Sequence, residues 1–295
     1  MSSKQRILMT GATGFLGSNL LIKLVDVGYE VIILKRSFSD TKRINGCLKK
    51  IKYYDIDQEG IEKCFTENRI DVFIHCATDY GRKNTDPLQI IEANLILPLK
   101  ILEIGLKNSC FRFINTDTIL DKGINSYSLS KKQFSDWLKM YSDRAVCVNV
   151  VLEHFYGPFD DRTKFVPFII DKMLSNAAEV DLTFGQQKRD FIYIDDVVDA
   201  FTVILENIAN MDKGFYNYEI GADKLVTIKE IVSLIKEMSE NKVTRINFGA
   251  VPYRANEVME PKIDTSSIRQ IGWTPKTKLI DGLRKTLEME IEQRK

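Results

Sequence analysis

Near its N-terminus the chain reads Thr10-Gly11-Ala12-Thr13-Gly14-Phe15-Leu16-Gly17. An apolar run at 7–9 precedes this stretch and a run of helical character at 18–27 follows it, so the pattern predicts a strand, a glycine-rich turn and a helix. Gly11 permits a tight turn, Gly14 lets the backbone approach a pyrophosphate, and Gly17 allows the helix to pack closely on the strand. The helix N-terminus adds free N–H groups and a positive dipole end.

An ordinary turn between a strand and a helix is the alternative interpretation, because three spaced glycines alone are a weak signal. The strand-turn-helix context favours a dinucleotide site instead. Its expected contacts in this stretch are Gly11, Thr13, Gly14, Phe15, Leu16 and Gly17.

Composition excludes several classes of protein. The 295 residues suffice for one large domain or two unequal ones. The 42 basic and 41 acidic residues leave a formal charge of +1, so no bulk field favours nucleic acid or an anionic membrane. No apolar run approaches the length of a membrane span and no secretory signal is visible, so we expect a cytoplasmic protein. The five cysteines and two histidines lack metal-type spacing, which predicts reduced thiols and no metal site.

The order of predicted elements indicates an α/β fold. Strand character occurs at 30–34, 51–54, 71–76, 111–115 and 145–152, and helical character at 60–67, 87–106 and 126–141. Strands that alternate with helices form a doubly wound parallel sheet. We expect this dinucleotide-binding domain to span 1–153, with part of 190–215 returning to it. A smaller C-terminal α/β lobe at 154–295 is expected to bind substrate, and the crevice between the two is the default substrate site.

The residues that follow the second predicted strand bear on the choice of coenzyme. NAD-binding chains place an acidic residue about twenty residues past the glycines, for the ribose 2′-hydroxyl. This chain has Lys35-Arg36-Ser37 there. A guanidinium and a hydroxyl suit the oxygens of a 2′-phosphate, so the sequence favours NADP(H) over NAD(H). The alternative is that these are solvated loop charges.

A phenol and an ammonium group are spaced for chemistry at Tyr127 and Lys131. Four residues apart on a helix, they lie on one face, one turn from each other. A nearby cation favours the phenolate, so we expect a lowered pKa for Tyr127 and a role in proton transfer at a carbonyl or carbinol oxygen. Thr116 and Thr118 offer a hydroxyl just past the end of the preceding strand. A surface Tyr–Lys pair is the alternative, which the upstream glycines and threonines make less probable.

Taken together, these motifs resemble the extended short-chain dehydrogenases/reductases, the NAD(P)-dependent nucleotide-sugar epimerase/dehydratase/reductase group, over nearly the whole chain. The motifs are the glycines at 11–17, Asp55-Ile56, His75-Cys76-Ala77, Asn94, Tyr127 with Lys131, Tyr156-Gly157-Pro158, the run at 189–196 and Ile271-Gly272-Trp273-Thr274-Pro275. The resemblance implies a Rossmann-like fold. It also implies coenzyme contacts at Asp55, Ile56, Cys76, Ala77, Thr78, Asn94, Tyr127 and Lys131.

The same resemblance implies catalytic roles. Lys131 would also bind the nicotinamide ribose, and a strand-end threonine would orient the substrate oxygen. Counting from the strand favours Thr116, and Thr118 stays as an alternative because the segment from Thr118 to Tyr127 is shorter than is common in the group. The 4,6-dehydratases of the group carry a Glu after Thr-Asp. Thr118 cannot act as that carboxylate, which argues against dehydration.

Within the group the chain is most similar to the branch of CDP-abequose and CDP-paratose synthases, which reduce a CDP-linked 4-keto-3,6-dideoxyhexose with NADPH. The substrate-binding residues that this implies are Arg82, His154, Val166, Phe184, Arg189, Arg254 and Glu257. Arginine suits a diphosphate through its bidentate geometry. His154 replaces an asparagine common in the group, and a core histidine is an equally good interpretation.

The leading hypothesis is therefore an NADPH-dependent 4-ketoreductase of a nucleotide-linked deoxysugar for polysaccharide or O-antigen biosynthesis. The first alternative is an NAD-dependent nucleotide-sugar 4-epimerase, and the second is a non-catalytic NADP(H)-sensing protein on the same fold. The helices at 87–106 and 126–141 are compatible with a homodimer, although burial within a monomer explains their apolar rows too.

Overall fold

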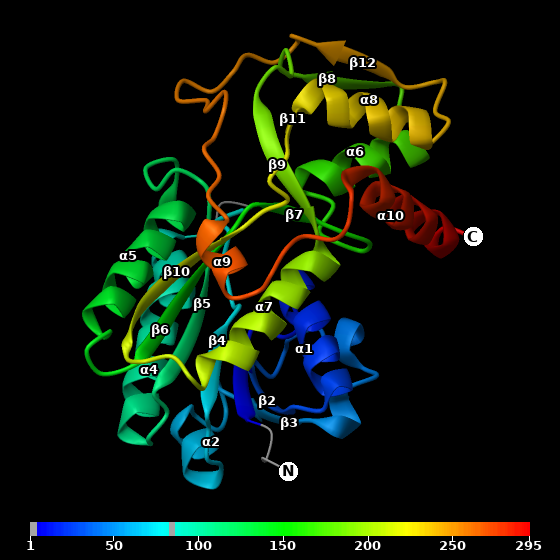
Figure 1. Ribbon diagram of the computed structural model, residues 1–295. Helices are drawn as coiled ribbons and strands as arrows, with labels where there is room; N and C mark the ends of the chain where they lie inside the picture. Colours follow the sequence, from blue (N-terminus) through cyan, green and yellow to red (C-terminus); the bar gives the residue numbers. More distant parts are fainter. Residues whose placement is uncertain (1–4, 83–85) are drawn as a thin grey trace. The chain divides into compact units, whose positions relative to one another are not determined.

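The computed structural model describes residues 5–82 and 86–295. The chain forms two compact units (Figure 1). Unit 1 contains Met1–Leu152, Val198–Glu219 and Gln270–Gly272. Unit 2 contains Glu153–Val197, Ile220–Arg269 and Trp273–Lys295.

Unit 1 is built on a seven-stranded sheet with the order β10-β6-β5-β4-β1-β2-β3. Its strands are β1 (Arg6–Thr10), β2 (Glu30–Lys35), β3 (Lys52–Asp55), β4 (Val72–His75), β5 (Arg112–Thr118), β6 (Val146–Leu152) and β10 (Gly214–Ile220). Strands β1 to β6 pair in parallel, and β1 lies between β2 and β4. The strand order therefore reverses direction at β1, which is where open parallel sheets bind ligands. The predicted doubly wound, Rossmann-like sheet is confirmed.

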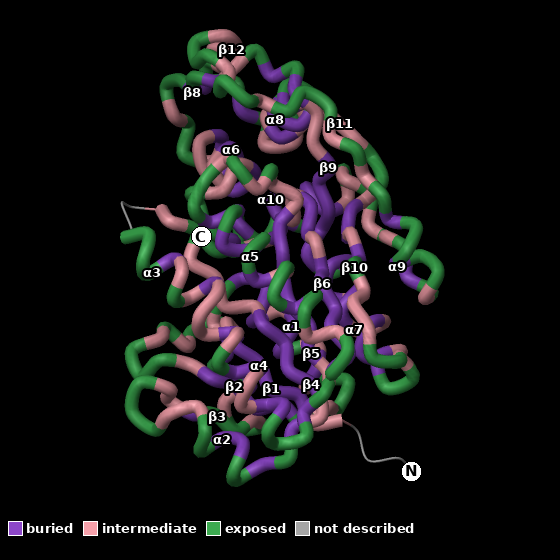
Figure 2. Tube along the Cα trace, turned by 90° about the vertical axis from the view of Figure 1, so that its left-hand side faces the viewer, coloured by how far each residue is buried: buried purple, intermediate pink, exposed green. Residues whose placement is uncertain are grey.

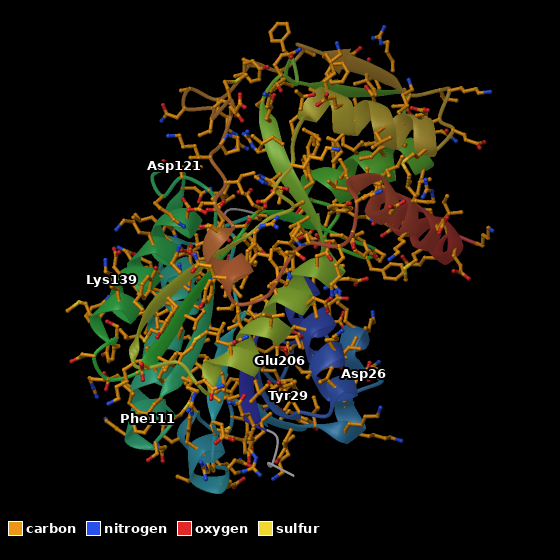
Figure 3. The ribbon with its side chains drawn as sticks, in the orientation of Figure 1. Asp26, Tyr29, Phe111, Asp121, Lys139 and Glu206 are labelled. Carbon is orange, nitrogen blue, oxygen red and sulfur yellow. The ribbon has the colours of Figure 1, made fainter. Side chains whose placement is uncertain are left out.

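Helices cover both faces of this sheet. They are α1 (Phe15–Val27), α2 (Glu62–Glu67), α3 (Pro87–Ile91), α4 (Leu97–Lys107), α5 (Ser126–Met140) and, from Val198 onward, α7 (Ile194–Ile208), with 3₁₀ turns η1 (Lys42–Ile44) and η2 (Leu48–Lys50). Figure 1 shows α4 and α5 on one face and α1 and α7 on the other. Lys23 of α1 pairs with Asp199 of α7 at 3.1 Å, and Tyr29 and Glu206 lie near each other at the same two helices (Figure 3). The buried core follows the central strands (Figure 2).

The helix predicted at 87–106 is not a single regular helix. A π-helical segment, η3 (Glu92–Ile96), separates α3 from α4. Pro98 lies in the first turn of α4, where a missing N–H costs little. The extra residue per turn in a π segment changes which side chains point inward, and η3 buries Asn94 completely. The irregularity therefore directs a polar side chain into the unit.

Unit 2 is a smaller α/β body. Its strands are β7 (His154–Tyr156), β8 (Glu179–Leu182), β9 (Lys188–Tyr193), β11 (Leu225–Thr227) and β12 (Arg245–Phe248), and its helices are α6 (Phe165–Leu174), α8 (Ile228–Met238), α9 (Ser266–Gln270) and α10 (Leu279–Gln293). β9 pairs in parallel with β7 and antiparallel with β11, whereas β8 pairs with β12. Thr227 and Glu230 form a capping box at the start of α8. Pairing with β9 makes 154–156 a strand.

In residues 5–82 and 86–295, no helix combines the length and the apolar character needed to cross a bilayer.

Candidate active site

The glycine-rich turn brings three backbone segments into contact. Gly11 has a φ of +69°, and its carbonyl accepts a hydrogen bond from the Gly14 N–H at 3.0 Å. A Cβ atom on Gly11 would lie 2.3 Å from the Ala77 nitrogen, and one on Gly17 would lie 2.1 Å from the Gly11 carbonyl oxygen. No side chain fits at either position. The turn, the first helix and the end of β4 therefore pack at backbone distance.

Gly14 differs from Gly11 and Gly17 because the space beside it is less crowded. A Cβ atom there would meet only the Gly11 carbonyl oxygen, at 3.3 Å. Gly14 is the N-cap of α1 and has no side chain to satisfy the first N–H groups, and the first turn that follows, 15–18, is uncharged. A helix start with this geometry can accept an anion. The turn fits the pyrophosphate of a dinucleotide.

The three residues predicted to bind a 2′-phosphate have different surroundings. Lys35 forms an ion pair with Asp55 and also lies over the ring of Tyr53. Ser37 donates from its backbone N–H and its hydroxyl to Asp57, at 2.8 and 2.6 Å. The side chains of Lys35 and Ser37 are therefore already bound to carboxylates at or just after the end of β3.

Arg36 keeps an exposed guanidinium, which lies 4.8 Å from the ring centre of Phe38. Its partner is an aromatic face and not a carboxylate, so its N–H groups stay available to an anion. Of the predicted triplet, Arg36 is therefore the side chain best placed to bind a phosphate.

Tyr127 and Lys131 lie one turn apart on α5, and both are buried. Asn125 starts this helix with a capping box to Ser128, which fixes the position of the following Tyr127. The phenol of Tyr127 hydrogen-bonds with Thr118, and its ring lies 5.0 Å from that of Tyr80. The guanidinium of Arg82 lies 4.9 Å from the ring centre of Tyr80, so the predicted substrate residue Arg82 belongs to this cluster.

The structure corrects the expected protonation of Tyr127. Burial raises the pKa of the phenol above its usual value, and the neighbouring ring of Tyr80 raises it further. The prediction of a lowered pKa is wrong because desolvation outweighs the favourable charges nearby. The phenol therefore holds its proton at neutral pH.

The length of β5 determines which of the two threonines lies beside Tyr127. This strand does not end before Thr116, because it pairs with β6 through Thr118 and Leu152. Thr116 and Thr118 are two residues apart and so lie on the same face. Thr116 donates to the His75 carbonyl at 3.0 Å, whereas Thr118 reaches Tyr127. The count along the sequence favoured Thr116, but the structure places Thr118 at the phenol.

Lys131 is fully buried, and within residues 5–82 and 86–295 its ammonium nitrogen has no hydrogen-bond partner. Burial lowers the pKa of Lys131 to about 8, and Asp117 opposes that shift. A buried ammonium without a partner is costly unless a ligand supplies acceptors. The hydroxyls of a ribose would do so, which fits the predicted coenzyme.

The other predicted coenzyme residues lie around the turn. Ile56 and Cys76 donate their backbone N–H groups to the Lys35 and Thr10 carbonyls, at 2.9 and 3.2 Å. Ala77 donates to the Thr10 hydroxyl at 3.4 Å. Thr78 follows Ala77 in the same loop beyond β4.

The side chain of Asn94, a predicted coenzyme contact, forms hydrogen bonds within the protein. Its amide nitrogen donates to the Asp79 carbonyl at 2.8 Å and to the Ser130 hydroxyl at 3.0 Å, and its oxygen accepts from the Asp79 N–H at 2.8 Å. Both amide hydrogens are therefore used inside the protein. Asn94 holds the loop after β4 against α5.

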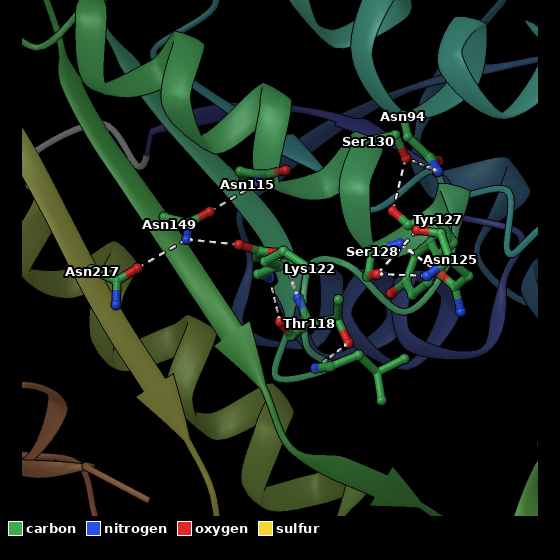
Figure 4. Close-up of polar contacts among 12 residues, drawn as sticks. Asn94, Asn115, Thr118, Lys122, Asn125, Tyr127, Ser128, Ser130, Asn149 and Asn217 are labelled. Carbon is green, nitrogen blue, oxygen red and sulfur yellow. Dashed lines mark hydrogen bonds and ion pairs between the residues drawn. The ribbon is translucent and has the colours of Figure 1, made fainter. Parts of the chain in front are cut away.

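Sequence reasoning missed a partly buried polar network that runs across β5, β6 and β10 (Figure 4). It is formed by Asn115, Asp117, Lys122, Asn149 and Asn217. A signal existed, because Asn149 interrupts the otherwise apolar strand Val146–Leu152. A polar residue in a buried strand indicates a partner on a neighbouring strand.

Unit 2 brings three predicted substrate residues together. Arg189 forms an ion pair with Glu257 and donates to the Val258 carbonyl at 2.6 Å. His154 lies against Phe191, with ring centres 5.8 Å apart. Burial and the charge of Arg189 lower the pKa of His154 to about 4, so its ring is neutral at neutral pH. The cluster thus offers a cation and a neutral imidazole.

The remaining predicted substrate residues differ in exposure and do not form one cluster of contacts. Val166 is buried in α6, whereas Phe184 is exposed and packs on Tyr253 with ring centres 6.1 Å apart. Arg254 is exposed, and its carbonyl accepts from the Glu257 N–H at 3.1 Å. Arg254 is therefore near Glu257 along the backbone.

Known proteins resemble the whole chain. The profile of the NAD dependent epimerase/dehydratase family matches residues 7–221. A CDP-abequose synthase from Salmonella muenchen is 36% identical over 295 residues, which cover 97% of this chain and 98% of that relative. One from Yersinia pseudotuberculosis is 32% identical over 269 residues, or 87% of this chain and 91% of the relative. The structure of UDP-glucose 4-epimerase with UDP-glucose from Thermotoga maritima has a TM-score of 0.84 at 24% identity, with 98% of this chain and 100% of that one covered.

The limited crowding at Gly14 gives a prediction with a matched control. Gly14 has φ −77° and ψ 175°, which alanine adopts, and its Cβ atom would lie 3.3 Å from the Gly11 carbonyl oxygen, so Gly14→Ala should lower the melting temperature only slightly. The added methyl group would occupy the anion cradle and weaken binding of NADPH by about tenfold, or about 1.4 kcal/mol. Gly17→Ala should instead lower the melting temperature strongly, because its methyl group meets backbone. Nicotinamide fluorescence and thermal unfolding measure the two effects, and unchanged NADPH affinity in Gly14→Ala would contradict the cradle.

Proposed function

Because the chain belongs to the NAD dependent epimerase/dehydratase family, we propose that it is an NADPH-dependent 4-ketoreductase of a nucleotide-linked 4-keto-deoxyhexose. The chain is a nucleotide-sugar-modifying enzyme that uses a pyridine nucleotide. Full-length similarity to CDP-abequose synthases supports a CDP-linked substrate. The observation that carries the proposal is a buried Tyr127 that holds its proton, hydrogen-bonded to Thr118 and one turn from Lys131.

The residues of unit 1 fit the coenzyme. The turn at Gly14 would bind the pyrophosphate, and the ammonium of Lys131 would bind ribose hydroxyls. Arg36 would bind the 2′-phosphate. When bound, a reduced nicotinamide supplies the hydride for the C4 carbon.

Tyr127 serves as the proton donor. As C4 is reduced, the phenol O–H bond breaks and its proton moves to the C4 oxygen, which becomes the product hydroxyl. Thr118 orients that oxygen through a hydrogen bond, and the positive charge of Lys131 stabilises the tyrosinate that remains. A solvent proton then restores the phenol. In the overall reaction, the ketone gains one hydride from the coenzyme and one proton, taken up in the end from solvent, and becomes an alcohol.

Residues of unit 2 would bind the nucleotide part of the substrate. Arg189 and the exposed Arg254 are suited to a diphosphate, and a neutral His154 can hydrogen-bond with a hydroxyl. The hydrogen bonds of Arg189 to Glu257 and to the Lys188 and Val258 carbonyls fix the guanidinium, so the diphosphate would bind to the N–H groups that these three bonds do not use. Val166 and Phe184 are proposed to lie near the base.

One observation favours the rival function. Asp57 lies at Ser37, where a carboxylate would suit a ribose 2′-hydroxyl and so NAD. This arrangement would fit a nucleotide-sugar 4-epimerase that recycles its coenzyme. The third hypothesis, an NADP(H) sensor without activity, leaves the buried cluster of Tyr127, Thr118 and Lys131 without a purpose.

Assembly and location are part of the proposal. The exposed side of α5 carries Leu129, Trp137 and Met140, which would pack in a homodimer. All five cysteines are free thiols, which suits the reducing cytoplasm.

The direct test is an absorbance assay at the nicotinamide band with nucleotide-linked 4-ketosugars, and NMR of the product. Wild-type protein should oxidise NADPH with a CDP-linked 4-keto-deoxyhexose. Tyr127→Phe should lower kcat by about 10³-fold, because the proton donor is lost. Tyr141→Phe, which removes a hydroxyl bonded to Glu103 at the other end of α5, should leave the rate unchanged.

Two results would count against this function. Equal turnover in Tyr127→Phe would remove the phenol from the mechanism. Interconversion of nucleotide sugars without net oxidation of coenzyme would establish the epimerase instead.

The two threonines separate in a second experiment. Thr118→Val should lower kcat by about 10²-fold, because it deletes the hydroxyl at the phenol. Thr116→Val should mainly lower stability, by about 1 kcal/mol, because the His75 carbonyl loses its donor. A larger loss of kcat in Thr116→Val would reverse the assignment.

Coenzyme selectivity depends on Arg36 in this proposal. Arg36→Ala should weaken NADPH binding by about tenfold or more and leave NADH binding unchanged, because only NADPH carries the 2′-phosphate. Fluorescence titrations with both coenzymes measure the ratio. Equal losses for the two, or tighter binding of NADH by the wild type, would refute the role of Arg36.

A further inference from the structure

Beside the proposed catalytic hydroxyl lies an ion pair that the reaction does not yet use. The carboxylate of Asp117 is 3% exposed, and its Oδ1 atom lies 2.8 Å from the Nζ atom of Lys122. The same ammonium donates to the Thr118 carbonyl at 2.6 Å (Figure 4). Lys122 belongs to the short segment between β5 and α5. It therefore ties that segment to the residue whose hydroxyl meets Tyr127.

Neighbouring strands hold the carboxylate in place. Its Oδ2 atom accepts from the Asn149 amide at 3.2 Å, and its Oδ1 atom also accepts from the Thr118 N–H at 2.7 Å. The Asn149 amide also donates to Asn217 at 2.9 Å, and its oxygen accepts from Asn115 at 2.8 Å. Asp117 is thus fixed by strands β6 and β10 as well as by its own. A carboxylate with this many partners cannot easily reorient.

The pair also lies within the electrostatic reach of Lys131. Asp117 favours the charged form of Lys131, and Lys122 disfavours it. The titratable groups that face Lys131 come from four segments. They are His75 and Cys76 at the end of β4, Asp117 on β5, Lys122 before α5 and Tyr127 on α5. Burial lowers the pKa of His75 and raises the pKa of Cys76 and Tyr127, so all three are neutral at pH 8. The net charge around Lys131 therefore depends on Asp117 and Lys122.

We propose that Asp117 and Lys122 are positioning residues of the active site: together they hold Thr118 against Tyr127, and they place charges of opposite sign on the side of the site that Lys131 faces. This inference rests on the proposed function, because it assigns Lys131 to the coenzyme. It extends that function to two residues to which the proposed function assigns no contact with coenzyme or substrate.

The opposite signs distinguish this role from a merely structural one. Burial lowers the pKa of Lys131 to about 8 in the protein without coenzyme. A bound ribose that accepts hydrogen bonds favours the ammonium, so affinity for the coenzyme is full below that pH and falls as the pH rises through it. Without Lys122 the charged form of Lys131 is favoured, so the fall in coenzyme affinity should move to higher pH. Without Asp117 the charged form is disfavoured, so the fall in affinity should move to lower pH. If the ion pair only stabilised the local structure, loss of Lys122 and loss of Asp117 would change the pH dependence of coenzyme affinity in the same direction.

The experiment compares Lys122→Met and Asp117→Asn with wild type. NADPH dissociation constants are measured by fluorescence from pH 6.5 to 10. We expect the midpoint of the affinity loss to move up by about one pH unit in Lys122→Met and down by about one in Asp117→Asn. Lys131→Met should remove the pH dependence. Lys63→Met, which breaks the exposed pair of Lys63 with Glu59 in the same unit, should match wild type.

A second measurement needs neither coenzyme nor substrate. The folded pKa of Lys131 lies below its unfolded value, so this group makes the free energy of unfolding rise with pH between about 8 and 10.4. Urea unfolding across that range, minus the same series in a Lys131→Met background, isolates the rise. It should begin at higher pH in Lys122→Met and at lower pH in Asp117→Asn.

A kinetic comparison tests the hold on Thr118. Lys122→Met should lower kcat about tenfold with little change in the substrate KM, because the hydroxyl acts in the transition state. Lys122→Arg keeps the charge and should recover most of the rate. Shifts of the same sign in both charge variants, or none, would overturn the inference even if NADPH-dependent reduction is observed. Absence of reduction in wild type would refute the function, and the unfolding series would still decide the electrostatic role.

Discussion

The close approach of the glycine turn to the end of β4 determines the geometry of unit 1. At Gly11 the space that a side chain would need is filled by the backbone of Cys76 and Ala77. The contact fixes where the chain leaves β4, and Asn94 then holds the following loop against α5. The ring of Tyr80 in that loop packs on Tyr127. A backbone contact at one end of the sheet thus positions the environment of the proposed proton donor.

Burial then determines the charges of that environment. The interior penalises every charged form, so the pKa of Lys131 falls and that of Tyr127 rises. Asp117, a carboxylate close to both, keeps its place through hydrogen bonds from Thr118 on its own strand and from Asn149 on β6. A polar network of this kind is stable only when its members are satisfied. The ammonium nitrogen of Lys131 is one of the buried polar atoms without a hydrogen-bond partner among the described residues, and a ligand would supply the acceptors that it lacks.

The sequence predicted the features that depend on short stretches of the chain. It did not predict side-chain positions that depend on pairing between strands far apart in the sequence. The glycines, the helix that carries Tyr127 and Lys131, and the alternation of strands and helices each follow from short patterns. The hydroxyl at Tyr127 does not, because the length of β5 is set by its pairing with β6. Nor do the surroundings of Lys35, whose carboxylate partner comes from β3 twenty residues later. The direction of the pKa shift at Tyr127 required its burial, which no spacing reveals.

The protonation of Tyr127 bears on the direction of the reaction as well as its site. A 4-epimerase begins by removing a proton from a sugar hydroxyl, so its tyrosine must first act as a base. A reductase begins with a tyrosine that gives its proton away. Burial against Tyr80 favours the protonated phenol, and Thr118 supplies a hydrogen bond to it. The same residues serve either enzyme, and a phenol that holds its proton is what the proposed reduction requires.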